Sequence, residues 1–465
     1  MTTTRRVHLQ TLGCARNETD SAELAARLTA TGWELVDDPE TADAVLVNTC
    51  GFIESARKES VDQLLIAADL KGESNVKAVV AVGCMAERYG KELANEFTEA
   101  DAVLGFDEYA NIGETLAQIV GGVKMPSHTP QDRRLLTASA PLERQAENLV
   151  VPGHSAGSSS NDVLRVRLDS KPYAPLKLAS GCDRRCTFCA IPRFRGSYIS
   201  RRPTDIIAEA VWLSERGVKE LFLVSENTTS YGKDLGDVRL LESVLPALAS
   251  IDGIERIRVS YLQPAEMRPT LIEAMANTEK VAPYFDLSFQ HASASVLRKM
   301  RRFGGPDEFM ALVESIRSVL PDAAVRSNFI VGFPGETQAD FDTLCQFIEN
   351  ARLDAVGIFG YSDEADTEAL TFEDKIAENV ISHRVEEITS LADEIANQRA
   401  EDRIGMRARV IVESVEDGVE GRTQYQGPEV DGITLIENVD GATIGDMIDV
   451  EFVDTDGIDL VAHEV

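Results

Sequence analysis

The chain has 465 residues, 43% hydrophobic and 27% charged, which is the balance of an ordinary globular protein with room for about three domains. Its formal net charge of −32 disfavours non-specific nucleic-acid binding, which relies on Lys and Arg, and favours a basic partner. The first residues contain no apolar signal-peptide core, and no apolar run is long enough to span a bilayer. We therefore expect a cytoplasmic protein without a membrane partner.

Residues 1–120 alternate strand-like runs with amphipathic helices, which predicts a parallel sheet covered by helices. The runs are RVHLQTL, DAVLVNT and KAVVAVG, and a cysteine with a glycine neighbour follows each of them: Cys14, Cys50 and Cys84. Ligands gather beyond the carboxyl ends of the strands in open parallel sheets, so the three thiols can converge on one group. Position alone leaves a second interpretation equally open, in which they are small buried core residues.

Residues 121–163 are rich in Pro, Ser, Gly and His and lose the periodicity of the first segment. This composition is typical of an exposed, flexible linker. We expect no chemistry there.

Residues 164–403 contain six strand-like runs, mostly separated by helical patterns, and end in one amphipathic helix at 376–403. The runs are APLKLAS, ELFLVS, RIRVSYLQ, YFDLSFQ, RSNFIVGF and AVGIFGYS. Six units are two short of an eightfold barrel, so an α/β chain with a partial (βα)6 TIM-like barrel is predicted. An active site would lie just past the strands, where the polar residues are Cys182–Cys189, Glu226, Asn227, Gln263, Gln290, His291, Gly332–Thr337, Tyr361 and Ser362.

The run Cys182-Asp-Arg-Arg-Cys186-Thr-Phe-Cys189 places three thiols in one short loop. An iron–sulfur cluster normally takes four cysteines, so three would leave one iron open to a small molecule and make the loop catalytic. Zinc is the main alternative, although zinc prefers four Cys or His ligands and no histidine is near in the sequence. The odd count of seven cysteines, with no export signal, argues against disulfides.

Other features near the predicted barrel mouth carry two interpretations each. The glycines of Gly332-Phe-Pro-Gly335-Glu-Thr either admit a ligand or form a tight turn. His291 is either a satisfied structural histidine or a residue that faces the cluster. Cys345 has apolar neighbours at helical spacing and is predicted to be core. Four arginines form either a solvated face or a site for a carboxylate or phosphate: Arg193, Arg195, Arg201 and Arg202.

Residues 404–465 read as five short strands with glycine turns, which predicts a small β-barrel of the oligonucleotide-fold type. The segment has 3 Lys plus Arg and 15 Asp plus Glu, so its net charge is 3 − 15 = −12. A barrel that grips RNA is normally basic. We therefore expect no direct nucleic-acid binding.

These features together resemble the radical S-adenosylmethionine methylthiotransferases. The resemblance rests on TLGCARNETDS, VNTCGFIESARKES, VGCMAERY, SGCDRRCTFCAIPRFRGSYISR, VGFPGET and FGYSDEADTEA, and it extends from about residue 6 to the C-terminus. It implies a methylthiotransferase domain at 1–120, a linker at 121–163, a radical S-adenosylmethionine (SAM) partial barrel at 164–403 and a TRAM domain at 404–465.

The resemblance also implies two 4Fe–4S clusters, with SAM as cosubstrate. The catalytic, radical-generating cluster is held by Cys182, Cys186 and Cys189, and the cluster that carries or donates sulfur by Cys14, Cys50 and Cys84. One SAM molecule methylates that sulfur, and another yields the radical that abstracts hydrogen from the target. The implied cosubstrate-binding residues are Glu226, Asn227, Gln290, Arg201, Gly332 and Gly335. Many relatives carry Gln-Asp in place of Glu226-Asn227, which leaves the contacts of this pair with SAM open.

Within this family, FQHAS followed by KMRR, together with GPEVDG, is similar to the branch that methylthiolates an aspartate β-carbon of ribosomal small-subunit protein twelve. The acidic barrel agrees with a basic protein substrate, and an external electron donor and a sulfur donor are implied partners. The alternative is the branch that methylthiolates a tRNA adenosine, for which a basic barrel is expected. A third hypothesis is a non-catalytic iron–sulfur electron-transfer protein, but this function does not account for an open iron inside a barrel.

Overall fold

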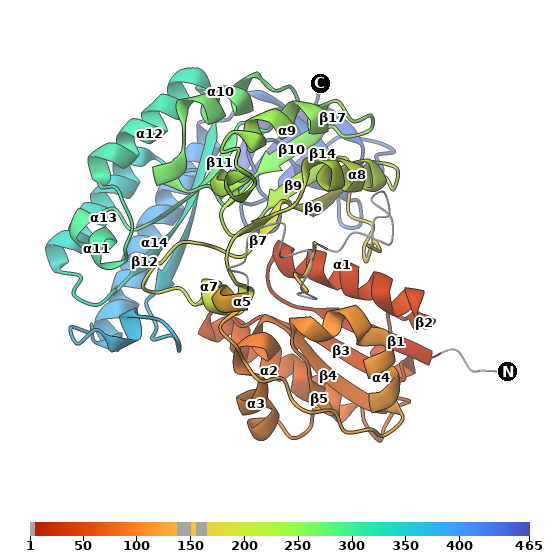
Figure 1. The fold of residues 1–465 in the computed structure, drawn as a ribbon. Helices are drawn as coiled ribbons and strands as arrows, with labels where there is room; N and C mark the ends of the chain where they lie inside the picture. Colours follow the sequence, from red (N-terminus) through yellow and green to blue (C-terminus); the bar gives the residue numbers. More distant parts are fainter. Residues whose placement is uncertain (1–4, 137–149, 155–164) are drawn as a thin grey trace. The chain divides into compact units, whose positions relative to one another are not determined.

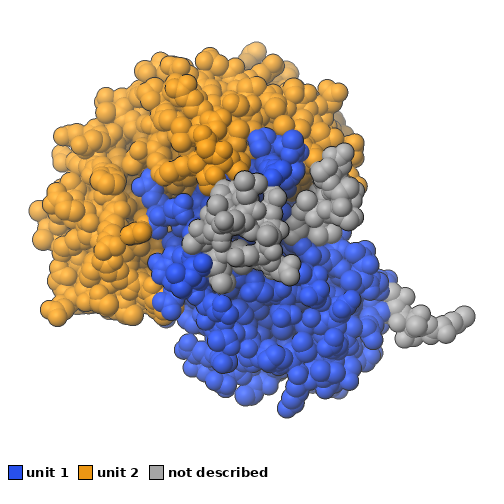
Figure 2. Space-filling model, viewed as in Figure 1, with its two compact units in different colours: residues 1–170, 179–184, 190–205 blue, residues 171–178, 185–189, 206–465 orange. Residues whose placement is uncertain are grey.

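The computed structural model describes residues 5–136, 150–154 and 165–465 (Figure 1). Its contacts divide the chain into two compact units, which Figure 2 shows in different colours. The first unit comprises residues 1–170, 179–184 and 190–205, and the second comprises residues 171–178, 185–189 and 206–465. The boundary passes through the cysteine-rich loop, so Cys182 is described with the first unit and Cys186 and Cys189 with the second.

The first unit is built on a parallel sheet with the strand order β2-β1-β3-β4-β5. Its two central strands are buried along their whole length, as their continuous apolar runs predict. The edge strands β2 and β5 were not predicted, because three and two residues are too short to show alternation. The strands are β1 Arg5–Thr11, β2 Trp33–Leu35, β3 Ala44–Thr49, β4 Ala78–Gly83 and β5 Ala102–Val103.

Helices connect the strands of this sheet, and two short strands, β7 Ala179–Ser180 and β8 Ile199–Ser200, form an antiparallel pair. The helices are α1 Ala15–Ala30, α2 Glu54–Asp69, α3 Cys84–Glu96, α4 Ile112–Val120, α5 Arg133–Leu136 and α7 Ile191–Arg195, with 3-10 turns η1 Pro39–Thr41 and η2 Phe106–Asn111.

The segment expected to be a flexible linker, 121–163, lies only partly within the described residues. Within it, Arg133 is buried and donates hydrogen bonds to Glu87 at 3.2 Å and Asp107 at 3.1 Å. The chain around α5 therefore packs on the first unit through ion pairs, which composition alone does not indicate. The linker boundaries remain a prediction.

The second unit contains the six predicted strands in two parallel sheets, β10-β9-β6 and β11-β12-β13. Isolated parallel bridges between Ile257 and Val281 and between Leu262 and Leu287 connect the two halves. The arrangement is a partial barrel. Its strands are β6 Tyr173–Lys177, β9 Glu220–Val224, β10 Arg256–Val259, β11 Tyr284–Gln290, β12 Ala324–Val331 and β13 Ala355–Gly360.

The apolar core of the second unit lies between these strands and the surrounding helices. The helices are α8 Pro203–Ser214, α9 Leu240–Ala249, α10 Pro269–Asn277, α11 Ala294–Lys299, α12 Pro306–Val319, α13 Gln338–Ala351 and α14 Glu378–Glu401, with 3-10 turns η3 Thr228–Ser230, η4 Lys233–Leu235, η5 Pro264–Glu266 and η6 Ala369–Thr371. Helix α14 is the long helix expected at 376–403. Across the described residues, no helix combines the length and apolarity needed to cross a bilayer.

The last strands close into the predicted small barrel, in the order β14-β15-β16-β18-β17. They are β14 Arg407–Ser414, β15 Val419–Arg422, β16 Thr434–Glu437, β17 Met447–Asp456 and β18 Asp459–Glu464. Fully buried Val410, Val450 and Ala462 contribute to its core.

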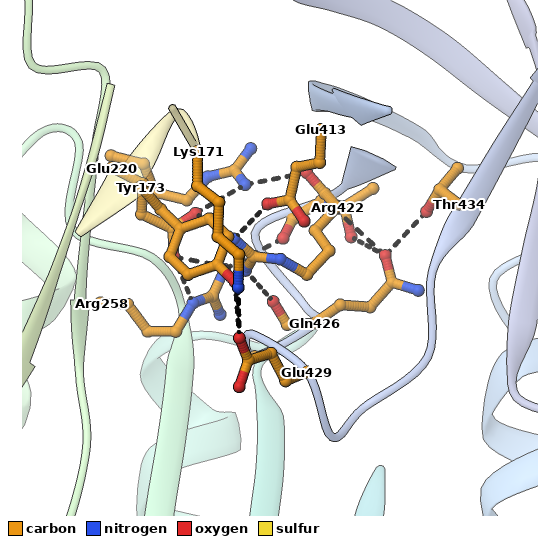
Figure 3. A network of polar contacts seen from close by, with 12 residues as sticks. Lys171, Tyr173, Glu220, Arg258, Glu413, Arg422, Gln426, Glu429 and Thr434 are labelled. Carbon is orange, nitrogen blue, oxygen red and sulfur yellow. Dashed lines mark hydrogen bonds and ion pairs between the residues drawn. The ribbon is translucent and has the colours of Figure 1, made fainter. Parts of the chain in front are cut away.

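A buried charged network joins the small barrel to the partial barrel (Figure 3). The carboxylate of Glu220, at the start of β9, accepts hydrogen bonds from Arg258 at 2.7 Å and from Arg256 at 3.3 Å, and Arg422 of β15 lies 3.4 Å away. Asp431, from the GPEVDG motif, accepts from Arg326 of β12 at 2.9 Å. The motif therefore anchors one barrel to the other.

Candidate active site

The three strand-end cysteines converge in the first unit because glycines let their loops approach closely. A Cβ on Gly13 would lie 2.7 Å from the Cβ of Cys50, and Gly13 has φ +90°. A Cβ on Gly51 would lie 2.7 Å from the Cα of Met85, the residue after Cys84. Such distances exclude any side chain at these two positions, so the glycine beside each cysteine is a requirement of close packing.

Polar residues from the same sequence motifs fix these loops. Asn17 donates to the carbonyl groups of Leu12 at 2.7 Å and Asn48 at 3.2 Å, which ties the end of β1 to the end of β3. The hydroxyl of Ser60 accepts from the amide of Cys50 at 2.9 Å. The positions of the thiols are therefore set by buried hydrogen bonds as well as by the sheet.

Two of the cysteines also sit at helix N-termini. Cys14 is the N-cap residue of α1, and Cys84 is the first residue of α3. Unpaired amide groups and the helix dipole make these positions favourable for negative charge. An anionic group bound by thiolates matches this environment.

Burial and two arginines set the electrostatics of the triad. Burial alone would raise the pKa of the Cys14 thiol, but Arg16 and Arg195 outweigh it and hold that pKa below its ordinary value. Burial raises the pKa of Cys50, and it raises the pKa of Cys84 to about 12 although Arg195 opposes the shift.

The thiols also act on one another. The charge on Cys14 raises the pKa of Cys50 as a secondary cause, and both raise the pKa of Cys84, so the three side chains lie close together. Within the described part of the chain, no three His, Cys, Asp or Glu side chains are near enough to share a single metal ion. Three cysteine thiols from neighbouring loops are the type of donor that binds an iron–sulfur cluster.

The four arginines after the cysteine-rich loop do not form one surface. Arg193 and Arg202 are exposed, whereas Arg195 and Arg201 are buried. Arg195 donates to Asp20 at 2.9 Å and to the sulfur of Cys84 at 2.9 Å. Of the two interpretations, contact with a carboxylate is correct for Arg195.

The first-unit end of the cysteine-rich loop is held by main-chain contacts. The amide of Cys182 donates to the carbonyl of Gly196 at 3.1 Å, and the amide of Arg184 donates to the sulfur of Cys182 at 3.4 Å. A Cβ on Gly181, which has φ +80°, would lie 2.2 Å from the carbonyl oxygen of Ser197. Close approach of two backbone segments therefore requires glycine before Cys182.

The second-unit part of the loop contains Cys186 and Cys189, both half-buried. The amide of Cys189 donates to the carbonyl of Cys186 at 3.2 Å, and Arg302 donates to the sulfur of Cys186 at 3.8 Å. Phe188 packs against an apolar cluster that includes Met300 and Phe333. Phe188 thus anchors the loop and gives it the apolar cover expected from its sequence.

Polar residues follow β9, β10 and β11 at the barrel mouth, as predicted. Asn227 is buried, and its amide group donates to Ser230 at 2.8 Å and Glu266 at 3.0 Å. Glu226 is partly exposed, and Gln263 is buried, with its main-chain N–H donating to the hydroxyl of Thr229. The side chain of Asn227 is therefore engaged by the protein, which favours a supporting role over direct ligand contact.

Backbone strain marks the same end of the barrel. Gln290 has φ +72° beside a register shift in β11, and Tyr261, after β10, has φ +59°. Non-glycine residues in this region are uncommon and concentrate at functional sites. These two positions support a ligand site at the mouth.

Gly332, Gly335 and His291 all have close contacts with protein atoms. A Cβ on Gly332 would lie 2.5 Å from Ile381, and one on Gly335 would lie 1.7 Å from the Nζ of Lys299. His291 is fully buried, its Nδ1 accepts from the amide of Ser293 at 2.9 Å, and its Nε2 lies 3.3 Å from Glu336. The glycine motif is thus a tight turn. The Nε2 of His291 has no hydrogen-bond partner among the described residues, so the two interpretations of this histidine stay open, and a contact of either glycine with SAM remains a prediction.

Two further predicted residues, Tyr361 and Cys345, lie in the second unit, and two residues near Cys84 were not predicted. Tyr361 is buried and donates to Asp363 at 2.9 Å, and Cys345 packs against the core, where burial raises its pKa to about 12. Sequence reasoning missed Asp20 and Tyr109 near Cys84. Asp20 was within reach, since it stands in the TLGCARNETDS motif six residues after Cys14.

Three family models match this chain. Residues 6–105 match the uncharacterized protein family UPF0004, residues 176–348 match the radical SAM superfamily, and residues 404–465 match the TRAM domain. The first match contains the strand-end triad, and the second contains the cysteine-rich loop.

The chain is also similar to curated proteins over its full length. Ribosomal protein uS12 methylthiotransferase RimO from Streptomyces coelicolor is 59% identical over 100% of this chain and 97% of the relative. The RimO protein from Nocardioides sp. is 58% identical over 98% of this chain and 96% of the relative.

Solved structures share the fold at low sequence identity. The radical SAM methyltransferase TsrM from Kitasatospora setae, with cobalamin and a [4Fe-4S] cluster bound, is 14% identical with a TM-score of 0.54, covering 87% of this chain and 76% of that chain. A second TsrM structure, with tryptophan substrate and a SAM analogue, gives a TM-score of 0.52 at 14% identity over 76% of this chain and 73% of that chain.

Proposed function

The chain belongs to the RimO family of ribosomal protein uS12 methylthiotransferases, and on that premise we propose that it methylthiolates the β-carbon of an aspartate of uS12. It is a radical SAM enzyme with iron–sulfur clusters. The observation that carries the proposal is the convergence of Cys14, Cys50 and Cys84 within the first unit. A radical SAM enzyme without sulfur transfer has no evident use for this second triad.

Each cysteine triad has its own role in this proposal. Cys182, Cys186 and Cys189 would hold a 4Fe–4S cluster that, with SAM, supplies a radical able to abstract hydrogen, and Cys14, Cys50 and Cys84 would hold one that supplies sulfur. An unactivated C–H bond offers no handle for acid–base catalysis, so no side chain acts as a general base on that bond. The chain's own residues position the groups and exclude water.

Residues at the mouth of the partial barrel would bind SAM. The strained backbone at Gln290 and the partly exposed Glu226 support a site there. Arg201, the cation of the predicted set, belongs to the first unit, and its contact with SAM stays a prediction. Asn227, Gly332 and Gly335 contact protein atoms in this structure, and their contact with SAM stays a prediction.

The acidic small barrel supports a basic protein substrate over RNA. Ten of its carboxylates are exposed, whereas Asp431 is buried in the joint between the barrels. A surface of this charge attracts a basic ribosomal protein and repels nucleic-acid phosphates. An external electron donor and a sulfur donor complete the partners, and the ribosomal substrate implies a cytoplasmic location.

The test is anaerobic reconstitution of the full chain with iron and sulfide, followed by incubation with SAM, a reductant and uS12. We expect the mass of a methylthio group to appear on one aspartate of uS12. The appearance of the modification on a tRNA adenosine instead would assign the chain to the other branch of the family.

Single cysteine variants separate the two triads in the same assay. Cys14→Ala and Cys182→Ala should each lose about half of the iron. Cys14→Ala should still cleave SAM to deoxyadenosine, whereas Cys182→Ala should not. A full iron load in both variants would contradict the two-cluster proposal, and Cys345→Ala is the matched control that should change neither measurement.

A further inference from the structure

Arg195 is a buried arginine that points at a cysteine sulfur. It ends α7, belongs to the first unit and stands six residues after Cys189 in the sequence. Its Nη2 donates at 2.9 Å to the carboxylate of Asp20 and at 2.9 Å to the sulfur of Cys84. The side chains of Arg195 and Asp20 are 4% and 0% exposed, so this ion pair is shielded from solvent.

The guanidinium group of Arg195 is held in one position by its surroundings. The ring of Phe106 lies beneath it, with 5.3 Å between the guanidinium carbon and the ring centroid. Asp20 stands on α1, the helix whose N-cap residue is Cys14. The same guanidinium thus connects the elements that carry Cys14 and Cys84.

Tyr109 provides a second polar group in this neighbourhood. Its side chain is fully buried, and its hydroxyl has no hydrogen-bond partner among the described residues. Burial raises its pKa, and the charges of Asp20 and Cys84 raise it further, so both groups are near. A buried hydroxyl without a partner beside Cys84 is the sign of a site made to hold another group.

We propose that Arg195 is a positioning residue that sets the reduction potential of the cluster held by Cys14, Cys50 and Cys84. This inference rests on the proposed function, which supplies the cluster. Reduction adds one electron and makes the cluster and its thiolates more negative, and a charged donor at the Cys84 sulfur stabilises that state. Arg195 therefore raises the potential, and the negative charge of Asp20 lowers it.

The experiment isolates this cluster in the full chain. Cys182, Cys186 and Cys189 are all replaced by Ala, and the remaining cluster is titrated with a redox mediator series while its spectrum is recorded. Arg195→Met should shift the one-electron reduction equilibrium at least tenfold toward the oxidised state, which is about 59 mV more negative. Asp20→Asn should shift it in the opposite direction.

Conservative and distant variants complete the set. Arg195→Lys keeps the charge and should give a smaller negative shift than Arg195→Met. Arg27→Gln removes an arginine of α1 that pairs with Glu23 at 2.7 Å, away from the thiols, and should leave the potential unchanged. Opposite shifts for Arg195 and Asp20 are the signature of an electrostatic role, since loss of structural support would move both variants in one direction.

An unchanged potential in Arg195→Met with full iron, or shifts of the same sign in Arg195→Met and Asp20→Asn, would overturn the proposal. If Arg195→Met does not retain iron, Asp20→Asn decides: a more positive potential supports the proposal, and an unchanged or more negative potential overturns it. The proposed function fails separately: a parent protein with the three Ala substitutions that binds no cluster would contradict the two-cluster mechanism before any arginine is changed.

Discussion

Each unit buries a carboxylate that pairs with arginine, but the spare guanidinium donors go to different acceptors. In the first unit, Arg195 binds Asp20 and extends to the sulfur of Cys84. In the second unit, Arg256 and Arg258 bind Glu220 and extend to main-chain carbonyl groups of the small barrel, including Arg422 at 2.9 Å. A guanidinium that donates to carbonyl groups joins two parts of a fold. A guanidinium that donates to a thiol can change the reduction potential of a group that the thiol binds.

The buried polar groups around Asp20 and around Glu220 also differ in how completely their hydrogen-bonding atoms are satisfied. Arg258 donates its remaining hydrogens to the carbonyl groups of Thr423 at 3.0 Å and Gln424 at 3.0 Å. By contrast, Tyr109 near Asp20 keeps a buried hydroxyl without a partner among the described residues. In the joint, the Nε of Arg422 has no partner among the described residues, but its two Nη atoms donate to Gln426 and Glu413. The hydroxyl of Tyr109 has no partner among the described residues, which is the pattern of a site that binds something further.

The largest expected effect is on the structural joint. Glu220→Gln leaves three buried guanidinium groups with one fewer anion, so the free energy of unfolding of the second unit should fall by about 3–5 kcal/mol. The chain has two tryptophans, Trp33 and Trp212, so in a Trp33→Phe background the fluorescence of Trp212 follows the second unit during denaturation.

The matched control for this prediction is Glu437→Gln, which removes an exposed carboxylate of the same small barrel, 3.2 Å from His463. It should leave stability nearly unchanged, because exposed ion pairs contribute little. Equal effects of the two variants would show that the Glu220 network is not the joint between the barrels.

Acid should weaken the same joint in the parent protein. Burial alone would raise the pKa of Glu220, but Arg258, Arg422 and Arg256 hold it to about 2, below the ordinary 4.5. A lowered pKa in the folded state means that the stabilisation is complete above the unfolded pKa and is lost as the pH falls from about 4.5 toward about 2. The slope attributable to Glu220 is at most about 1.4 kcal/mol per pH unit. The same denaturation experiment, repeated from about pH 5 to about pH 3, should show this slope in the parent and not in Glu220→Gln.

Sequence patterns predicted most of the elements that carry these side chains but not the two buried polar groups themselves. The cysteines at strand ends followed from the alternation of strands and helices, and the small barrel followed from its turns. Asp20 and Arg195 are 175 positions apart, and no local pattern relates them. Glu220 did carry a signal, since a charged residue opens the apolar run ELFLVS, and a buried carboxylate requires cations that only the folded chain can supply.

The smallest expected effect tests whether the buried polar group around Asp20 in the first unit has an unsatisfied hydrogen-bonding atom. Tyr109→Phe removes a buried hydroxyl without a partner, so the metal-free protein should gain about 1 kcal/mol of stability. In a Trp212→Phe background, Trp33 reports on the first unit. The matched change in the second unit is Tyr284→Phe, where the buried hydroxyl donates to Asp431. That variant, measured through Trp212 in the Trp33→Phe background, should lose about 1.5–3 kcal/mol because a hydrogen bond to a charged group is removed. If Tyr109→Phe instead lost stability, its hydroxyl would be satisfied in the metal-free protein, and the difference between the joint and a site open to a further group would disappear.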